Sequence, residues 1–91
     1  MEIIIRRATE EDIKRMSDKP IWACDVCDDA DWFYDYEVQC WISKGEAKVV
    51  YDGGSVDVRD GDYCVFPKGL RCVWHVTKPI QKYCELIMDD L

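Results

Sequence analysis

The chain has 91 residues, which is enough for one small domain (residues 1–91) and too few for two. Hydrophobic residues make up 48% of it, which excludes a disordered chain, and a formal net charge of -7 argues against nucleic acid or an anionic membrane surface as a partner. No apolar run is long enough for a signal segment or a membrane span, so we expect a cytoplasmic protein whose six cysteines are free or metal-bound rather than paired in a disulfide framework.

The first expected elements are a short strand and a helical segment. Three consecutive isoleucines at residues 3–5 predict the strand. Thr9 followed three residues later by Asp12 resembles a helix N-cap with a carboxylate on the first turn, which predicts one or two helical turns ending at Met16. The segment Ser17-Asp18-Lys19-Pro20 then ends the helix.

An acidic segment with a Cys-x-x-Cys pair follows. Its aspartates lack the glycine and the closing glutamate of a calcium loop, so we expect a solvated acidic loop. Cys24 and Cys27 have the spacing of half a zinc site or of a redox pair, but no second pair follows them. The pair therefore predicts thiols near the edge of the folded domain, with a metal or redox role left open.

From residue 36 onward, apolar and polar residues alternate with period two, which is typical of half-buried strands. Turn signals containing glycine recur at short, nearly regular intervals, at residues 44–45, 52–54, 60–61 and 67–69. We therefore predict strands at residues 36–43, 47–51, 55–58, 63–66, 71–76 and 81–88. Antiparallel strands of this length would close into a small barrel and so remove exposed edges.

The segment from Gly61 to Cys72 resembles the second cupin motif, in which a glycine, five residues, Pro-x-Gly and two further residues precede a histidine. Here Cys72 occupies the histidine position. The sequence FPKGLRC-x-W-x-V is similar to small single-domain cupins of the ureidoglycine aminohydrolase group. The resemblance implies an all-β, cupin-type jelly-roll barrel over residues 20–88, with a short N-terminal helical turn, that is frequently a homodimer. It implies no particular activity, because this fold serves many functions.

The resemblance also implies a metal site, but this chain lacks its usual ligands. The first cupin motif normally carries His-x-His and then a glutamate seven residues before a closing glycine. Counting back from Gly45 places Val38 at the glutamate position, and both histidines are missing. Glu37 is one residue away, so its side chain faces the other side of the strand unless a bulge turns it inward.

Cysteines offer a replacement for the missing metal ligands. If Val38 faces the interior, alternation also turns Cys40 inward, and Cys72 shares its face with Trp74. Together with Cys84, or with Cys64, these thiols would suit zinc or iron. The alternative is that the cysteines pack as small hydrophobic side chains and that the protein holds no metal.

A pocket inside the barrel is the other candidate site, bounded by Tyr34, Cys40, Cys72, Trp74 and Lys82. Lys82 set among aromatic side chains would bind a small carboxylate, or it would instead extend from a strand end into water. The only histidine, at position 75, is expected on the outer face beside Trp74.

Three functions remain open from the sequence. The first is a binding module for a small, anionic metabolite. The second is a metalloprotein or metalloenzyme with a cysteine-based site, and the third is a structural or dimerisation module with a vestigial pocket. Trp41 and Tyr63, on the outer faces, are expected to cover the sheet or to fill a dimer interface.

Overall fold

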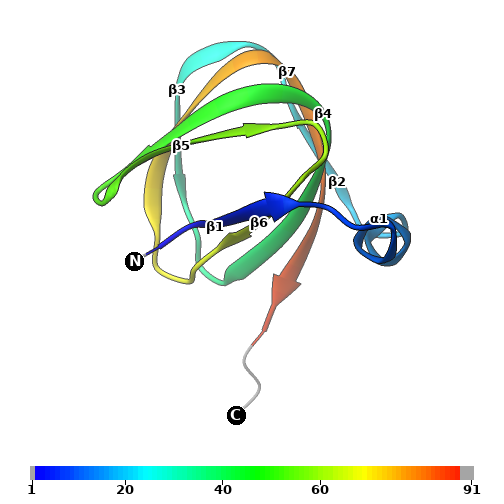
Figure 1. Cartoon of the computed structure of the whole chain (residues 1–91). Coiled ribbons are helices and arrows are strands. Elements are labelled where there is room, and N and C mark those ends of the chain that lie inside the picture. The colour runs from blue at the N-terminus through cyan, green and yellow to red at the C-terminus, as the bar shows by residue number, and fades with distance from the viewer. Residues whose placement is uncertain (1, 89–91) are drawn as a thin grey trace.

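The computed structural model describes residues 2–88 of the chain. It contains one short helix and seven strands that curl into a barrel, with the helix lying outside the barrel wall (Figure 1). The elements are β1 (Ile4–Arg7), α1 (Glu10–Met16), β2 (Ile21–Cys24), β3 (Cys27–Phe33), β4 (Glu37–Tyr51), β5 (Gly54–Arg59), β6 (Asp62–Phe66) and β7 (Arg71–Ile87). The prediction of an all-β barrel with a short N-terminal helix is therefore confirmed.

All the strand pairs are antiparallel. The sheet order is β1-β6-β4-β7-β2, while β3 also pairs with β7 and β5 with β4. Strand β7 is long enough to pair along one side with β4 and along the other with β3 and then β2. Both β2 and β3 are thus placed by the same strand, which matters for the candidate site.

Two predicted boundaries within the sheet are wrong. Residues 44–45 and 77–80 were expected to separate strands, but β4 and β7 each run through them as one strand. The pairing of β4 with β7 shifts register three times between Ile42 and Ala47. A bulge of this kind bends a strand without ending it, so the glycine marks a bend and not a turn.

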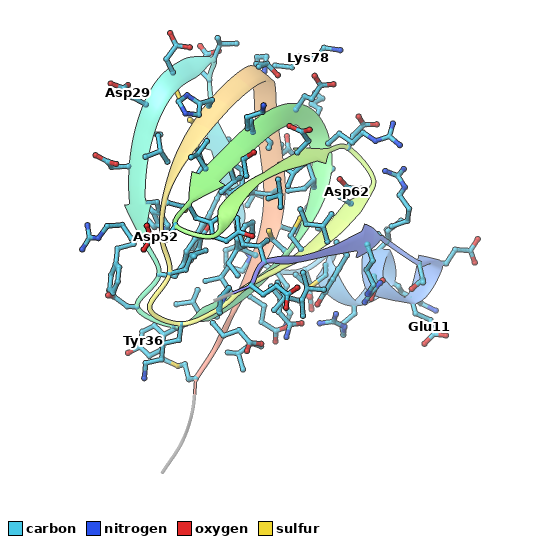
Figure 2. The ribbon with its side chains drawn as sticks, turned by 60° about the vertical axis from the view of Figure 1, so that its left-hand side comes forward. Glu11, Asp29, Tyr36, Asp52, Asp62 and Lys78 are labelled. Atoms are coloured by element: carbon cyan, nitrogen blue, oxygen red, sulfur yellow. The ribbon has the colours of Figure 1, made fainter. Side chains whose placement is uncertain are left out.

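The expectation of an acidic loop is also wrong, because residues 27–33 form strand β3. Of this strand only Cys27 and Ala30 are half-buried, and its acidic side chains are exposed. Figure 2 shows Asp29 directed outward from the barrel. The backbone of β3 still finds its partners in β7, so the strand forms although most of its side chains favour water.

The predicted inward faces are confirmed. Val38, Cys40 and Ile42 on β4 are at most 4% exposed, and Cys72, Trp74 and Val76 on β7 are equally buried. His75 lies between two inward-facing residues of β7 and is half-buried on the outer face, opposite Lys48. These buried faces meet in one hydrophobic core that fills the interior of the barrel.

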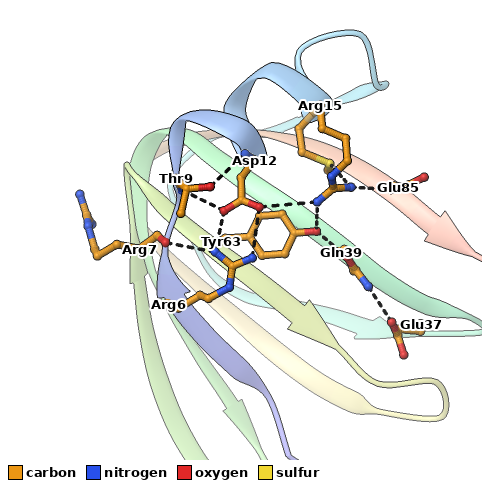
Figure 3. A network of polar contacts seen from close by, with 10 residues as sticks. Arg6, Arg7, Thr9, Asp12, Arg15, Glu37, Gln39, Tyr63 and Glu85 are labelled. Carbon is orange, nitrogen blue, oxygen red and sulfur yellow. Dashed lines mark hydrogen bonds and ion pairs between the residues drawn. The ribbon is translucent and has the colours of Figure 1, made fainter.

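Helix α1 is attached to the outer face of the barrel by a polar network (Figure 3). The predicted cap is present: the Asp12 backbone N–H donates to Thr9 Oγ1, and the Thr9 N–H donates to the Asp12 carboxylate. Arg15 of the helix donates a 2.6 Å hydrogen bond to the Tyr63 hydroxyl, which in turn donates to Gln39. Tyr63 is only 2% exposed, so within this chain it covers the sheet beneath the helix.

Candidate functional site

The candidate site is a cleft where β2 and β3 meet β7. It has a volume of about 550 Å³, within the usual range for small-molecule sites. Three tryptophans dominate its walls, one from each strand. The lining residues are Trp22, Ala23, Cys24, Ala30, Asp31, Trp32, Trp74, Val76, Ile80 and Lys82. We call it the tryptophan cleft.

Lys82 is the one cation among these lining residues. Its Nζ lies 3.7 Å from the centroid of the Trp74 ring, a close cation–π contact. Trp22 is directly opposite Lys82 in the β2–β7 pairing, and its ring meets that of Trp32 edge-on at 6.0 Å. The ammonium group is therefore held over an aromatic face inside the cleft, and none of the ion pairs among residues 2–88 involves it.

Asp31 also borders the cleft, but its side chain alternates to the face of β3 opposite that of Ala30 and Trp32. It lies on β3, opposite Val73 of β7, and is exposed. The tryptophan cleft thus presents one positive group, the Lys82 ammonium, on otherwise apolar and aromatic walls. Such an arrangement orients a small ligand through few polar contacts while the walls bury its apolar part.

Of the five residues predicted to bound a pocket, Trp74 and Lys82 line the cleft, whereas Tyr34, Cys40 and Cys72 lie in the packed core below it. Tyr34 stacks on Phe66 with ring centroids 5.0 Å apart, and burial raises the pKa of its hydroxyl far above the ordinary value of 10.0. Period two correctly turned Cys40 and Cys72 inward, whereas the position of Tyr34 was not predicted from alternation. The alternation does not tell how far an inward-facing side chain lies from the cleft. Large neighbouring rings fill the space around the residues of the core.

Sequence reasoning missed Trp22, Trp32, Cys24 and Asp31 as members of the site. Because no strand was predicted between Pro20 and residue 36, no face could be assigned to these residues. Tryptophans at positions 22 and 32 flank this acidic segment, and two large aromatic residues so placed were the sequence feature that could have indicated a binding site. Only the joint pairing of β2 and β3 with β7 shows that these residues surround one space.

Three buried thiols form a row across the barrel wall. Cys40 on β4 is directly opposite Cys64 on β6 and Cys84 on β7, and all three are at most 1% exposed. Hydrogen bonding to Cys64 raises the pKa of the Cys40 thiol well above 9.0. Hydrogen bonding to Cys40, together with burial, raises the pKa of Cys84 further. Both therefore remain protonated thiols near neutral pH.

The structure does not bring together the metal ligands expected from the sequence. Among residues 2–88 no three histidine, cysteine, aspartate or glutamate side chains form a group that would hold a metal ion, so Cys40, Cys72 and Cys84 do not form one. Burial raises the pKa of the Cys72 thiol, whereas a metal ligand must be a thiolate. Glu37 does not turn inward: its carboxylate accepts a 2.9 Å hydrogen bond from half-buried Gln39, whose side chain also meets Tyr63 on the outer face. These residues do not fit the zinc or iron site usual in cupins.

The two cysteines at the β2–β3 connection are arranged differently. Their Sγ atoms are 3.8 Å apart, and both residues are half-buried. Cys24 lines the tryptophan cleft, and Cys27 Sγ lies 4.0 Å from the Trp74 carbonyl oxygen. Of the six cysteines, these two are the ones that are not fully buried.

The antiparallel barrel with one short helix is that of a cupin-type protein. A model of the EutQ-like cupin domain matches residues 12–83. The chain therefore belongs to the EutQ-like cupin family.

Solved structures agree with this assignment. A DUF861 family protein from Thermotoga maritima is 36% identical over 94% of this chain and 100% of its own, with a TM-score of 0.88. The Clostridium difficile EutQ protein is 20% identical over 77% of this chain and 56% of its own, with a TM-score of 0.65. A cupin superfamily protein from Desulfitobacterium hafniense DCB-2 is 13% identical over 97% and 79% of the two chains, also with a TM-score of 0.65. The last two likenesses show the fold alone.

The search of curated proteins found no match. Within residues 2–88, the structure has no helix with the length and apolar composition needed to cross a membrane.

Proposed function

We propose that this cupin binds a small metabolite with a carboxylate group in the tryptophan cleft. The proposal concerns binding and assigns no reaction. The observation that carries it is the position of Lys82, whose ammonium group lies over Trp74 within a mostly apolar cleft. A cation placed in this way offers its remaining hydrogens to an anion.

The walls of the cleft support a ligand with an apolar or planar part. The rings of Trp22 on β2 and Trp32 on β3 meet edge-on, while Trp74 on β7 is only 4% exposed and forms the buried wall of the cleft. Aromatic side chains bury large areas at low conformational cost, so affinity would come from these walls and orientation from Lys82.

The test is a binding titration of small carboxylates, namely acetate, succinate, benzoate and glycine, against wild type and two variants. Lys82→Met keeps the apolar stem and removes the charge, and Lys78→Met is the matched control because Lys78 is exposed on the same strand. We expect Lys82→Met to weaken binding at least about tenfold, equivalent to about 1.4 kcal/mol, and Lys78→Met to leave it unchanged. Tryptophan fluorescence reports the binding, since three of the four tryptophans line the cleft.

Two outcomes would contradict the proposal. One is that no carboxylate of the panel alters the fluorescence or the melting temperature of the wild type. The other is that Lys82→Met binds the same carboxylates as tightly as the wild type does. The first outcome would favour a structural module with a vestigial pocket, whereas the second would show that the carboxylate is bound away from Lys82.

Three narrower expectations stay predictions. They are the homodimer, the cytoplasmic location and the specific likeness to the ureidoglycine aminohydrolase group. The first is checked by the molar mass in solution from light scattering. A homodimer would place one tryptophan cleft in each subunit.

A further inference from the structure

The strongest feature that ligand binding leaves unused is the pair of thiols at the β2–β3 connection. Cys24 is opposite Ile80, and Cys27 is opposite Val76, so both cysteines are fixed by pairing with the same strand, β7. Only Asp25 and Val26 separate them, and the Asp25 carboxylate accepts a 2.8 Å hydrogen bond from the Val26 N–H. The connection is thus held in the shape that places the two sulfurs together.

The distance between the sulfurs favours bond formation. At 3.8 Å they are in van der Waals contact, and a disulfide bond needs about 2.05 Å. Rotation of the two cysteine side chains can bring the sulfur atoms this much closer without movement of a strand. The pair is therefore preorganised for an intrachain disulfide.

Accessibility separates this pair from the other four cysteines. Cys40, Cys64, Cys72 and Cys84 are at most 2% exposed, so a dissolved reagent reaches them only if the barrel opens. Cys24 and Cys27 are half-buried, and Cys24 forms part of the cleft wall. A small reagent can enter there without unfolding of the sheet.

We propose that Cys24 and Cys27 form a redox site that exchanges with low-molecular-weight disulfides. In the first step the thiolate of one cysteine attacks the small disulfide, whose S–S bond breaks, giving a mixed disulfide and one released thiol. The second cysteine then attacks the mixed disulfide, forms the Cys24–Cys27 bond and releases the second thiol. The protein dithiol is oxidised, the small disulfide is reduced to two thiols, and the two thiol protons pass to the released groups.

The surroundings of Cys24 act on its thiol in two opposite directions. Burial and hydrogen bonding to Cys27 raise the pKa of the Cys24 thiol, while Lys82 acts to lower it. The Cys24 thiol is therefore mostly protonated near neutral pH, and Lys82 favours its thiolate, the form that attacks a disulfide.

The experiment treats the folded protein with oxidised glutathione and counts free thiols by alkylation after denaturation. The fully reduced chain has six. We expect the treated wild type to retain about four alkylated thiols without bound glutathione and to regain the other two with dithiothreitol. Cleavage on the amino side of aspartate separates residues 18–24 from 25–27, so the new bond joins two peptides that mass spectrometry identifies.

The variants Cys24→Ser and Cys27→Ser provide the controls. Each should stop at a stable mixed disulfide with one glutathione, because the second attack has lost its thiol. The proposal is overturned if wild type keeps six free thiols, if it stops at the same mixed disulfide as the variants, or if the new bond joins other cysteines. Circular dichroism of each variant before treatment ensures that the exchange is measured on folded protein, and Lys78→Met serves as a folded control with all six thiols.

Discussion

At the scale of single residues, Gly45 decides the shape of β4. Its φ of +97° lies in the region that favours glycine, and it sits within the bulge where β4 shifts register against β7. A Cβ at this position would collide with the Pro79 carbonyl oxygen and come within 2.6 Å of the Ile80 Cα. Because Ile80 lines the tryptophan cleft, the same close approach shapes the site.

We therefore predict that Gly45→Ala lowers the free energy of unfolding by at least about 3 kcal/mol, since backbone strain and a steric clash add together. Gly54→Ala is the control: its φ is also positive, at +136°, but its Cβ would have no neighbour within 4 Å. Strain alone should cost that variant about 1–2 kcal/mol. Urea unfolding of both variants measures the difference, and equal losses would argue against the clash.

At the scale of an element, α1 depends on Asp12. This carboxylate caps the helix and accepts a 2.6 Å hydrogen bond from Arg6 of β1. The hydrogen bond from Arg6 holds the pKa of Asp12 well below its ordinary value of 3.8, against the opposing effect of burial. A folded-state pKa below the unfolded one stabilises the protein above the unfolded value, and the contribution is lost as the pH falls below about 4.

Replacing Asp12 should consequently lower the free energy of unfolding at neutral pH and lower it less in acid. We predict that Asp12→Asn lowers the free energy of unfolding by about 1–2 kcal/mol at pH 7, because the negative charge that pairs with half-exposed Arg6 and favours the helix N-terminus is lost. The difference from wild type should shrink as the pH falls from 4 to 2. Glu11→Gln removes an exposed carboxylate from the same turn and should show neither effect. Chemical unfolding across this pH range is the measurement, and a constant difference would contradict the assigned cause.

At the scale of the whole molecule, β1 closes one edge of the sheet. It pairs with β6 alone. Its Arg6 donates to Asp12 of the helix network, and its Arg7 forms an ion pair with Asp62 at 2.9 Å. Ile3, just before the strand, is 7% exposed and belongs to the core. Without β1, the edge of β6 would be open to other chains.

Deletion of residues 1–7 should therefore destabilise the protein by at least about 3 kcal/mol and promote association, because a core side chain, ladder hydrogen bonds and edge protection disappear together. Urea unfolding and light scattering over a range of concentrations measure the two effects. Ile4→Thr keeps β1 while changing a side chain that is 55% exposed, so it should behave as wild type. A truncated protein with the wild-type midpoint and mass would contradict the role assigned to β1.

Several features of this protein follow from local sequence. Alternation placed Cys40, Cys72 and Trp74 on inward faces, because the side-chain period of a strand is independent of its partners. Thr9 and Asp12 predicted the helix cap, because capping is satisfied within four residues. The motif ending in Cys72 indicated a cupin, and its substitution at a usual ligand position already argued against the common metal site.

Tertiary structure decided the rest. The acidic residues 27–33 became a strand because β7 satisfies their backbone, and β4 continued through Gly45 because a bulge accommodates the bend. The tryptophan cleft and the contact between Cys24 and Cys27 exist only because β2 and β3 pair in succession along β7. Sequence alone determined which way the side chains of a strand face, since that depends on local geometry. Which of these side chains enclose a site depended on pairing between distant segments, and no local pattern encodes that pairing.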